Sequence, residues 1–133
     1  MKNSRKSFIS VYTVQAEHLD EMHHVNNVVY LQFMQSIAQE HWLAITTKEI
    51  RETHLWVVMR HEIDYRGQAV LGDRLKITTW VDQAEGVRTR RNTEIRHADT
   101  NKIIVSAQTI WCLIDGKSKR PKRLTPEFVS LFM

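Results

Sequence analysis

Acidic, imidazole and amide side chains crowd one short segment in the N-terminal part of the chain. Asp20 stands near its start, His23 and His24 follow, and Asn26 and Asn27 come just before an apolar run. A carboxylate in such company can act as a general base on water or attack a carbonyl directly. Residue types alone favour a structural reading: Asp20 caps a turn, His24 is half-buried, and Asn26 only caps a helix.

A long helix is predicted directly after this segment, from Val28 to Ile45. Its apolar residues return at helical spacing, and only a narrow stripe of glutamine and serine interrupts them, which predicts a helix buried nearly all round. Asn26 or Asn27 would cap it, because a short amide side chain accepts a free first-turn N–H. The unpaired N–H groups and partial positive charge of such a helix end are what a developing oxyanion needs.

The rest of the chain reads as strands. One strand, residues 8–15, precedes the helix, and four follow it at 55–65, 75–81, 87–98 and 102–115. Because short turns join consecutive strands, we expect these four to be antiparallel neighbours. The order strand, helix, four strands predicts an α+β fold with one helix packed on a curved antiparallel sheet.

Length and composition favour one globular domain, residues 1–133. Two separate cores in 133 residues would each be too small. No apolar run reaches the length of a membrane span, and the polar, basic stretch 1–7 is followed by no apolar signal core. The single cysteine, Cys112, forms no internal disulfide, which is typical of a reducing cytoplasm.

The net charge of +4 and the pI near 9.4 indicate attraction to polyanions, including the phosphates of coenzyme A. No recognisable nucleic-acid-binding module accompanies that charge, so we expect no nucleic-acid partner. Arg88, Arg90 and Arg91 are candidates for phosphate binding, although strand alternation places Arg91 on the opposite face from the other two.

The segment from Asp20 to Tyr30 resembles the signature of the 4-hydroxybenzoyl-CoA thioesterase family, roughly Asp-x-x-Gly-His-Val-Asn-Asn-x-x-Tyr. The residues that match in order and spacing are Asp20, His24, Val25, Asn26, Asn27 and Tyr30. The segment is also similar to the Asp-x-Asn-x-His-x-Asn-Asn pattern of plant and bacterial acyl-ACP thioesterases. Ile63-Asp64-Tyr65, Gly72-Asp73 and Arg120-Pro121 also fall where the family has comparable features.

The resemblance implies a hotdog fold, in which a curved antiparallel sheet of about five strands wraps a long central helix. It implies a homodimer or homotetramer with active sites between subunits, and hydrolysis of an acyl-CoA or acyl-ACP thioester. Asp20 would be the general base or nucleophile, the backbone N–H of Asn27 the oxyanion donor, and His24 a further catalytic group. Asn26 and Tyr30 would contact the substrate. No cofactor is expected, since coenzyme A is part of the substrate.

Three positions depart from the family patterns. His23 stands at the usual glycine, so we expect the loop to avoid a glycine-only backbone angle. Met22 stands where the acyl-ACP branch has asparagine, which weakens that assignment. Gln35 stands where many relatives carry a glutamate, so a role that needs a charge there is lost.

Two other functions stay open at this point. One is a hotdog dehydratase, which needs a histidine and an acid acting on a hydroxyacyl thioester; the other is a non-catalytic acyl-CoA or acyl-carrier binding module. The remaining histidines show no metal-ligand spacing. Cys112 is expected to be a packed thiol, Trp42 a core residue, and Trp56 and Trp80 residues of an acyl pocket, a dimer contact or an exposed sheet face.

Overall fold

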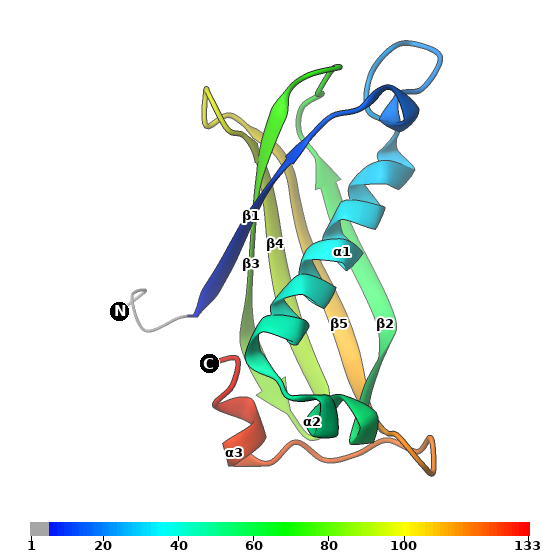
Figure 1. The fold of residues 1–133 in the computed structure, drawn as a ribbon, viewed down its shortest axis with the longest axis vertical. Helices are drawn as coiled ribbons and strands as arrows, with labels where there is room; N and C mark the ends of the chain where they lie inside the picture. The colour runs from blue at the N-terminus through cyan, green and yellow to red at the C-terminus, as the bar shows by residue number, and fades with distance from the viewer. Residues whose placement is uncertain (1–5) are drawn as a thin grey trace.

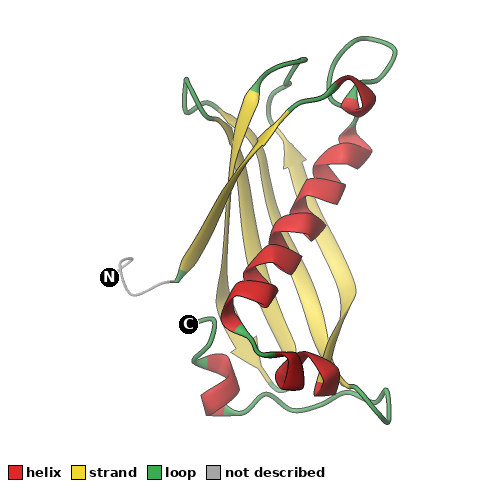
Figure 2. Ribbon diagram, viewed as in Figure 1, coloured by secondary structure: helices red, strands yellow, loops and turns green. Residues whose placement is uncertain are grey.

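Five antiparallel strands form one sheet, and a single long helix lies across it (Figures 1 and 2). This computed structural model describes residues 6–133. The strands are β1 (Ser7–Thr13), β2 (His54–Tyr65), β3 (Arg74–Glu85), β4 (Arg88–His97) and β5 (Ile103–Asp115), and the helix is α1 (Asn27–Ile45). The five predicted strands and the predicted helix are therefore confirmed, as is the α+β class.

The order of the strands in the sheet is β1-β3-β4-β5-β2. The last three strands are antiparallel neighbours, as predicted, but β2 and β3 are not, so that part of the prediction was wrong. β1 occupies the free edge of β3, with Ser7 opposite Trp80 and Thr13 opposite Arg74. After β2 the chain therefore crosses to the opposite edge region of the sheet, where β3 lies next to β1. Strand β2 is left as an edge strand, paired only with β5 among the described strands.

A register shift between Val58 and Arg60 changes which residues of β2 face the helix. Trp56 lies out of phase with the apolar residues around it in the sequence, yet it packs against Trp42 of α1, with ring centroids 5.8 Å apart. The apolar side chains that alternate with it, Leu55, Val57 and Met59, are instead exposed. A bulge of this kind reverses the side-chain phase of a strand, which alternation alone does not reveal.

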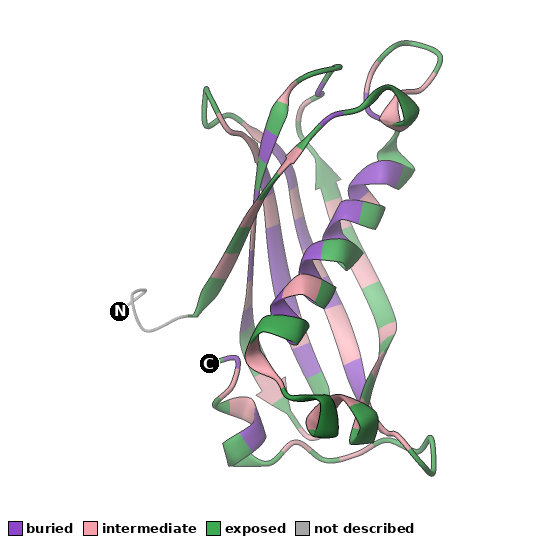
Figure 3. Ribbon diagram, in the orientation of Figure 1, coloured by how far each residue is buried: buried purple, intermediate pink, exposed green. Residues whose placement is uncertain are grey.

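Helix α1 is buried on one side only, which corrects the expectation of a helix buried nearly all round. Tyr30, Phe33, Met34 and Ile37 face the sheet and form the main core with residues of β3, β4 and β5. Val28 and Leu43 are exposed together with the polar stripe. The reason is that the described residues supply one sheet and no second layer over the outer side of the helix (Figure 3).

A second core closes the lower end of the molecule in Figure 1. Trp42, Leu113, Phe128 and Phe132 pack there, the last two from the C-terminal segment that contains α3 (Pro126–Val129). Helix α2 (Lys48–Thr53) joins α1 to β2 at the same end, and a 3-10 turn, η2 (Ala16–His18), follows β1. These three short elements were not predicted, because each is too short to show a period.

None of the helices in residues 6–133 has the length and apolar character needed to cross a membrane. The basic N-terminal stretch examined for a signal begins with residues 1–5, which lie outside the described residues.

Candidate functional site

Asp20 closes the loop that leads into α1. Its Oδ1 accepts hydrogen bonds from the backbone N–H groups of Met22 at 2.9 Å and His24 at 3.2 Å. The Asp20 N–H donates to the His24 carbonyl at 2.8 Å, and the His23 N–H donates to the Asp20 carbonyl at 3.0 Å. These bonds fix the carboxylate, and its second oxygen, Oδ2, takes part in none of them. Asp20 thus caps a turn and still presents an oxygen that is available for chemistry.

His23 adopts the left-handed backbone conformation, with φ of 65°. The expectation that a histidine at the glycine position would keep the loop out of this conformation was wrong. Histidine is among the side chains that tolerate it best, although an L-residue there costs about 1–2 kcal/mol relative to glycine. The four hydrogen bonds of the Asp20 turn offset that cost, so the loop keeps its shape without the glycine.

The N-terminus of α1 begins immediately after this loop. Asn26 is its cap: the side-chain Oδ1 accepts the N–H of Val28 at 3.1 Å, and the Asn26 carbonyl accepts the N–H of Val29 at 2.8 Å. Within residues 6–133, no acceptor is described for the N–H of Asn27, the first residue of the helix. This exposed donor, at the positive end of the helix dipole, has the character of an oxyanion donor.

The other predicted residues of the motif lie in different surroundings. His24 is half-buried beside the Asp20 turn. Tyr30 is 2% exposed, and burial raises the pKa of its phenol to about 12, so it is neutral at physiological pH. Its ring lies 6.2 Å from that of Tyr65 at the end of β2. The motif therefore splits into two parts: the half-buried Asp20 with the exposed Asn27, and a buried tyrosine that anchors the helix to the sheet.

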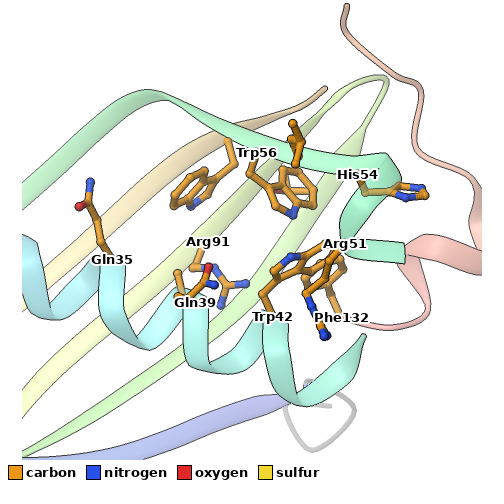
Figure 4. Close-up of a pocket in the computed structure, with 12 residues that line it drawn as sticks. Gln35, Gln39, Trp42, Arg51, His54, Trp56, Arg91 and Phe132 are labelled. Atoms are coloured by element: carbon orange, nitrogen blue, oxygen red, sulfur yellow. The ribbon is translucent and has the colours of Figure 1, made fainter. Parts of the chain in front are cut away.

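A cavity of about 310 Å³ lies between the C-terminal half of α1 and the sheet (Figure 4). Its walls include Gln35, Gln39 and Trp42 of α1, Trp56 of β2, Arg91 of β4 and Phe132 of the C-terminal segment. A volume of this size, with tryptophan and phenylalanine side chains beside a few polar groups, is typical of a small-molecule site. The proposal that Trp56 lines a pocket agrees with this position.

Within one chain, the Asp20 loop lies at the N-terminal end of α1 and the cavity lies along its C-terminal half. Gln35, the first helix residue at the cavity, comes eight positions after Asn27, which is about 12 Å along a helix axis. No residue of the segment 19–30 lines the cavity. A single chain therefore carries the motif and the cavity without joining them into one site.

Arg91 is the unexpected residue of the cavity wall. It is only 6% exposed, and its Nη1 donates to His41 Nδ1 at 2.9 Å and to Thr79 Oγ1 at 3.0 Å. Burial lowers the pKa of Arg91 to about 10, so the guanidinium remains charged at neutral pH. Burial and the neighbouring charge of Arg91 lower the pKa of His41 to about 4, which keeps that imidazole neutral.

The three arginines proposed for phosphate binding do not converge, as strand alternation predicted. Arg88 is exposed, and the Nε and Nη2 of Arg90 donate to the carboxylate of Asp82, both at 2.8 Å. Arg91 lies on the other face, under the helix. Of the three, Arg88 has the most accessible guanidinium, and the phosphate role of each stays a prediction.

Groups of three or more His, Cys, Asp and Glu side chains placed to share a metal ion do not occur in residues 6–133. Cys112 is buried in β5, which confirms the packed thiol. Trp42 is buried, as predicted. Sequence reasoning missed His41 as a partner of Arg91, although its spacing from Ile37 and Ala38 places it on the buried face of the helix.

Comparison with known proteins bears on this arrangement. The family model that describes the acyl-ACP thioesterase N-terminal domain matches residues 5–132. The long-chain acyl-CoA thioesterase FadM of Escherichia coli is 28% identical over 116 residues, which cover 86% of this chain and 88% of that protein. A chloroplastic acyl-acyl-carrier-protein hydrolase of Cuphea viscosissima is 25% identical over 73 residues, 55% of this chain but only 18% of the plant protein. The chain thus spans a small part of the plant relatives it matches.

The fold also has solved counterparts. A 1,4-dihydroxy-2-naphthoyl-CoA thioesterase from Synechocystis superposes with a TM-score of 0.82 over 95% of both chains, at 19% sequence identity. This confirms the hotdog fold that the motif implied. The family match covers nearly the whole chain and includes the Asp20 loop, α1 and all five strands. The chain belongs to the acyl-ACP thioesterase N-terminal domain family.

Proposed function

We propose that this protein hydrolyses an acyl thioester of coenzyme A or of an acyl carrier protein, with Asp20 as general base or nucleophile. The observation that carries the proposal is the Asp20 carboxylate, which is held through Oδ1, in the loop that leads to the N–H of Asn27; among residues 6–133, neither Oδ2 nor this N–H has a described hydrogen-bond partner. Acyl transfer requires a basic oxygen and an oxyanion donor, and this segment of the chain supplies one candidate for each. The thioesterases among the relatives support the same reaction class.

The chemistry follows from these two groups. As a base, Asp20 takes a proton from water while the water oxygen attacks the thioester carbonyl carbon. The Asn27 N–H stabilises the charge that develops on the carbonyl oxygen. Collapse of the tetrahedral intermediate breaks the carbon–sulfur bond and releases a carboxylic acid and a thiol. As a nucleophile, Asp20 would instead form a mixed anhydride that water then cleaves. Transfer of labelled water oxygen into Asp20 in a single turnover distinguishes the two routes.

A second copy of the chain would complete the site. Strand β2 is an edge strand, and an exposed edge pairs readily with another strand. The start of α1 lies level with the end of β2, where Tyr30 meets Tyr65, and the later part lies level with its start, where Trp42 meets Trp56. Antiparallel pairing of two β2 strands about a two-fold axis would therefore bring the Asp20 loop of each copy next to the cavity of the other.

Mixed dimers test the proposed function. Asp20→Asn removes the base, and Ala38→Phe fills the cavity from a buried position on α1. Each variant alone should lose at least about 10²-fold in kcat. Random pairing of the two should restore roughly a quarter of wild-type activity, because half of the dimers are mixed and each mixed dimer has one intact site.

Two outcomes of this experiment contradict the proposal. If mixing restores nothing while both variants remain folded and dimeric, the motif and the cavity do not cooperate across an interface. If Ala38→Phe retains full activity, the acyl group does not occupy this cavity. A panel of aromatic, short-chain and long-chain thioesters of coenzyme A and of acyl carrier protein, with free thiol as the readout, then identifies the carrier and the acyl class.

A further inference from the structure

The cavity carries positive charge that no acid in its walls balances. Arg91 and Arg51 line it, and none of its lining residues is aspartate or glutamate. Arg51 is satisfied by Thr46, since its Nη1 donates to the Thr46 carbonyl at 2.7 Å. The described hydrogen bonds of Arg91 come from Nη1 alone and go to the neutral groups of His41 and Thr79. Arg91 is therefore a buried cation without a counterion among residues 6–133.

Another residue of the cavity wall, Trp111, has a donor without an acceptor among the described residues. Trp111 lines the cavity, and its buried Nε1 has no hydrogen-bond partner in the described part of the chain. An indole N–H can only donate. Unpaired buried donors are destabilising, and a buried charge without a partner more so, unless a ligand supplies the acceptor. The unbalanced charge of Arg91 in this wall indicates that an occupant of the cavity carries an anionic group.

The remaining walls exclude a wholly polar occupant. Trp42, Trp56 and Phe132 present aromatic surface, and Trp42 and Phe132 stack with their ring planes 4° apart. Gln35 and Gln39 are exposed neutral amides on the helix side, so they add polarity but no negative charge. Figure 4 shows Arg91 of β4 among the side chains that line the cavity. The cavity suits an apolar chain or ring with one anionic oxygen group.

We propose that the acyl group of the substrate ends in a carboxylate and that Arg91 binds it inside the cavity. The inference rests on the proposed function and narrows its substrate to the thioesters of dicarboxylic acids. Guanidinium and carboxylate form a strong, charge-assisted and often bidentate pair, and Arg91 is already largely desolvated before the ligand arrives. A plain fatty acyl chain of the same length leaves the charge unpaired, so the site discriminates against it.

Binding of unreactive thioethers tests the proposal without any hydrolysis. The probes are S-(5-carboxypentyl)-coenzyme A and S-hexyl-coenzyme A, which have six-carbon chains and differ in the terminal carboxylate. Wild-type protein should bind the carboxylate analogue roughly tenfold to hundredfold more tightly by calorimetry, the range for a hydrogen bond to a charged group. Arg91→Met, which keeps an unbranched, flexible stem and removes the guanidinium with its charge, should abolish that preference.

The matched control is Arg96→Met on the same strand. Arg96 pairs with Glu94 away from the cavity, so its loss should leave the preference unchanged. Arg91→Lys keeps the charge and should retain part of the preference, which serves if the methionine variant does not fold. Tighter binding of the hexyl analogue by the wild type, or an undiminished carboxylate preference in Arg91→Met, would overturn the inference.

The two proposals fail separately. If the carboxylate analogue binds through Arg91 but no thioester in the panel is cleaved, the cavity assignment stands and hydrolysis is wrong. If hydrolysis depends on Asp20 while hexanoyl-CoA is cleaved faster than adipoyl-CoA, the function stands and the carboxylate specificity is wrong.

Discussion

Asp20→Asn separates the catalytic reading of the motif from the structural one. The asparagine Oδ1 can accept the same N–H groups of Met22 and His24 that Asp20 accepts now, so the turn is kept. The charge and the basic oxygen are lost. We expect kcat to fall by a factor on the order of 10² or more, which is about 2.7 kcal/mol of transition-state stabilisation.

Stability gives the second readout of the same experiment. Asp20→Asn should change the free energy of unfolding by less than about 1 kcal/mol, because only the charge assistance of two hydrogen bonds is lost. Asp20→Ala removes the one acceptor, Oδ1, of both hydrogen bonds and should cost about 1–3 kcal/mol. In a domain of this size each kcal/mol lowers Tm by roughly 3–6 °C. Thermal unfolding followed by circular dichroism measures the difference.

Asp115 provides a matched control at the other end of the sheet. Its Oδ2 accepts the backbone N–H groups of Lys117 at 3.0 Å and Ser118 at 2.8 Å, which is the same kind of turn. Asp115→Asn should alter stability about as little as Asp20→Asn and leave kcat unchanged. Near-normal kcat of the folded Asp20→Asn protein, on a substrate that the wild type hydrolyses well, would refute the catalytic assignment.

Four further predictions follow from the same structure. Light scattering at micromolar concentration should show at least a dimer, and a purely monomeric protein would contradict the shared site. His23→Gly should be stabilising or neutral and His23→Val destabilising by about 1 kcal/mol or more in chemical denaturation, because a β-branched residue is strained at φ of 65°; equal stability of the two variants would contradict this. The pKa of His41 is lowered from 6.5 to about 4 in the folded protein. As the pH falls from 6.5 to 4, the unfolded chain therefore binds a proton at this histidine before the folded chain does, and the free energy of unfolding should fall by up to about 3 kcal/mol. His41→Gln should flatten that part of the pH profile. Replacing both Arg88 and Arg90 with alanine should raise KM for a CoA thioester more than it lowers kcat. A phosphate contact remote from the carbonyl stabilises the ground state and the transition state equally. An unchanged KM would show that these arginines do not bind the phosphates.

The elements of the fold were predictable because they are long and periodic, whereas their arrangement was not. The pattern of β2 could not show that the strand crosses to the far edge, since that depends on β1 taking the edge of β3. The bulge after Val58 is equally hidden, and it sends Trp56 toward the helix when alternation suggests the opposite. The short α2 and α3 carry no period at all.

The chemistry of the motif could be predicted from the sequence, but its position relative to the cavity could not. Residue types and spacing placed Asp20 before a helix N-terminus, and the structure adds that one carboxylate oxygen is committed to the turn. That the cavity lies about two turns further along α1 follows from how the helix crosses the sheet. Neither fact is local in sequence, so only the folded chain shows that the two lie apart, which is why the proposed site draws on a second copy.

The burial of Arg91 could have been predicted from the alternation of β4, but arginines are usually exposed and our prediction followed that rule. Ile95 is the large apolar residue of β4 that fixes which face is buried, and counting back in steps of two leads through Thr93 to Arg91. The alternation therefore placed this arginine under the helix from the start. An arginine is rarely buried unless it is paired, and that expectation favoured a solvated role in phosphate binding. Once the burial is known, the rule that buried arginines are paired supports the proposed ligand instead. The described neighbours of the buried Arg91 guanidinium are neutral, so an anionic ligand would supply the missing partner.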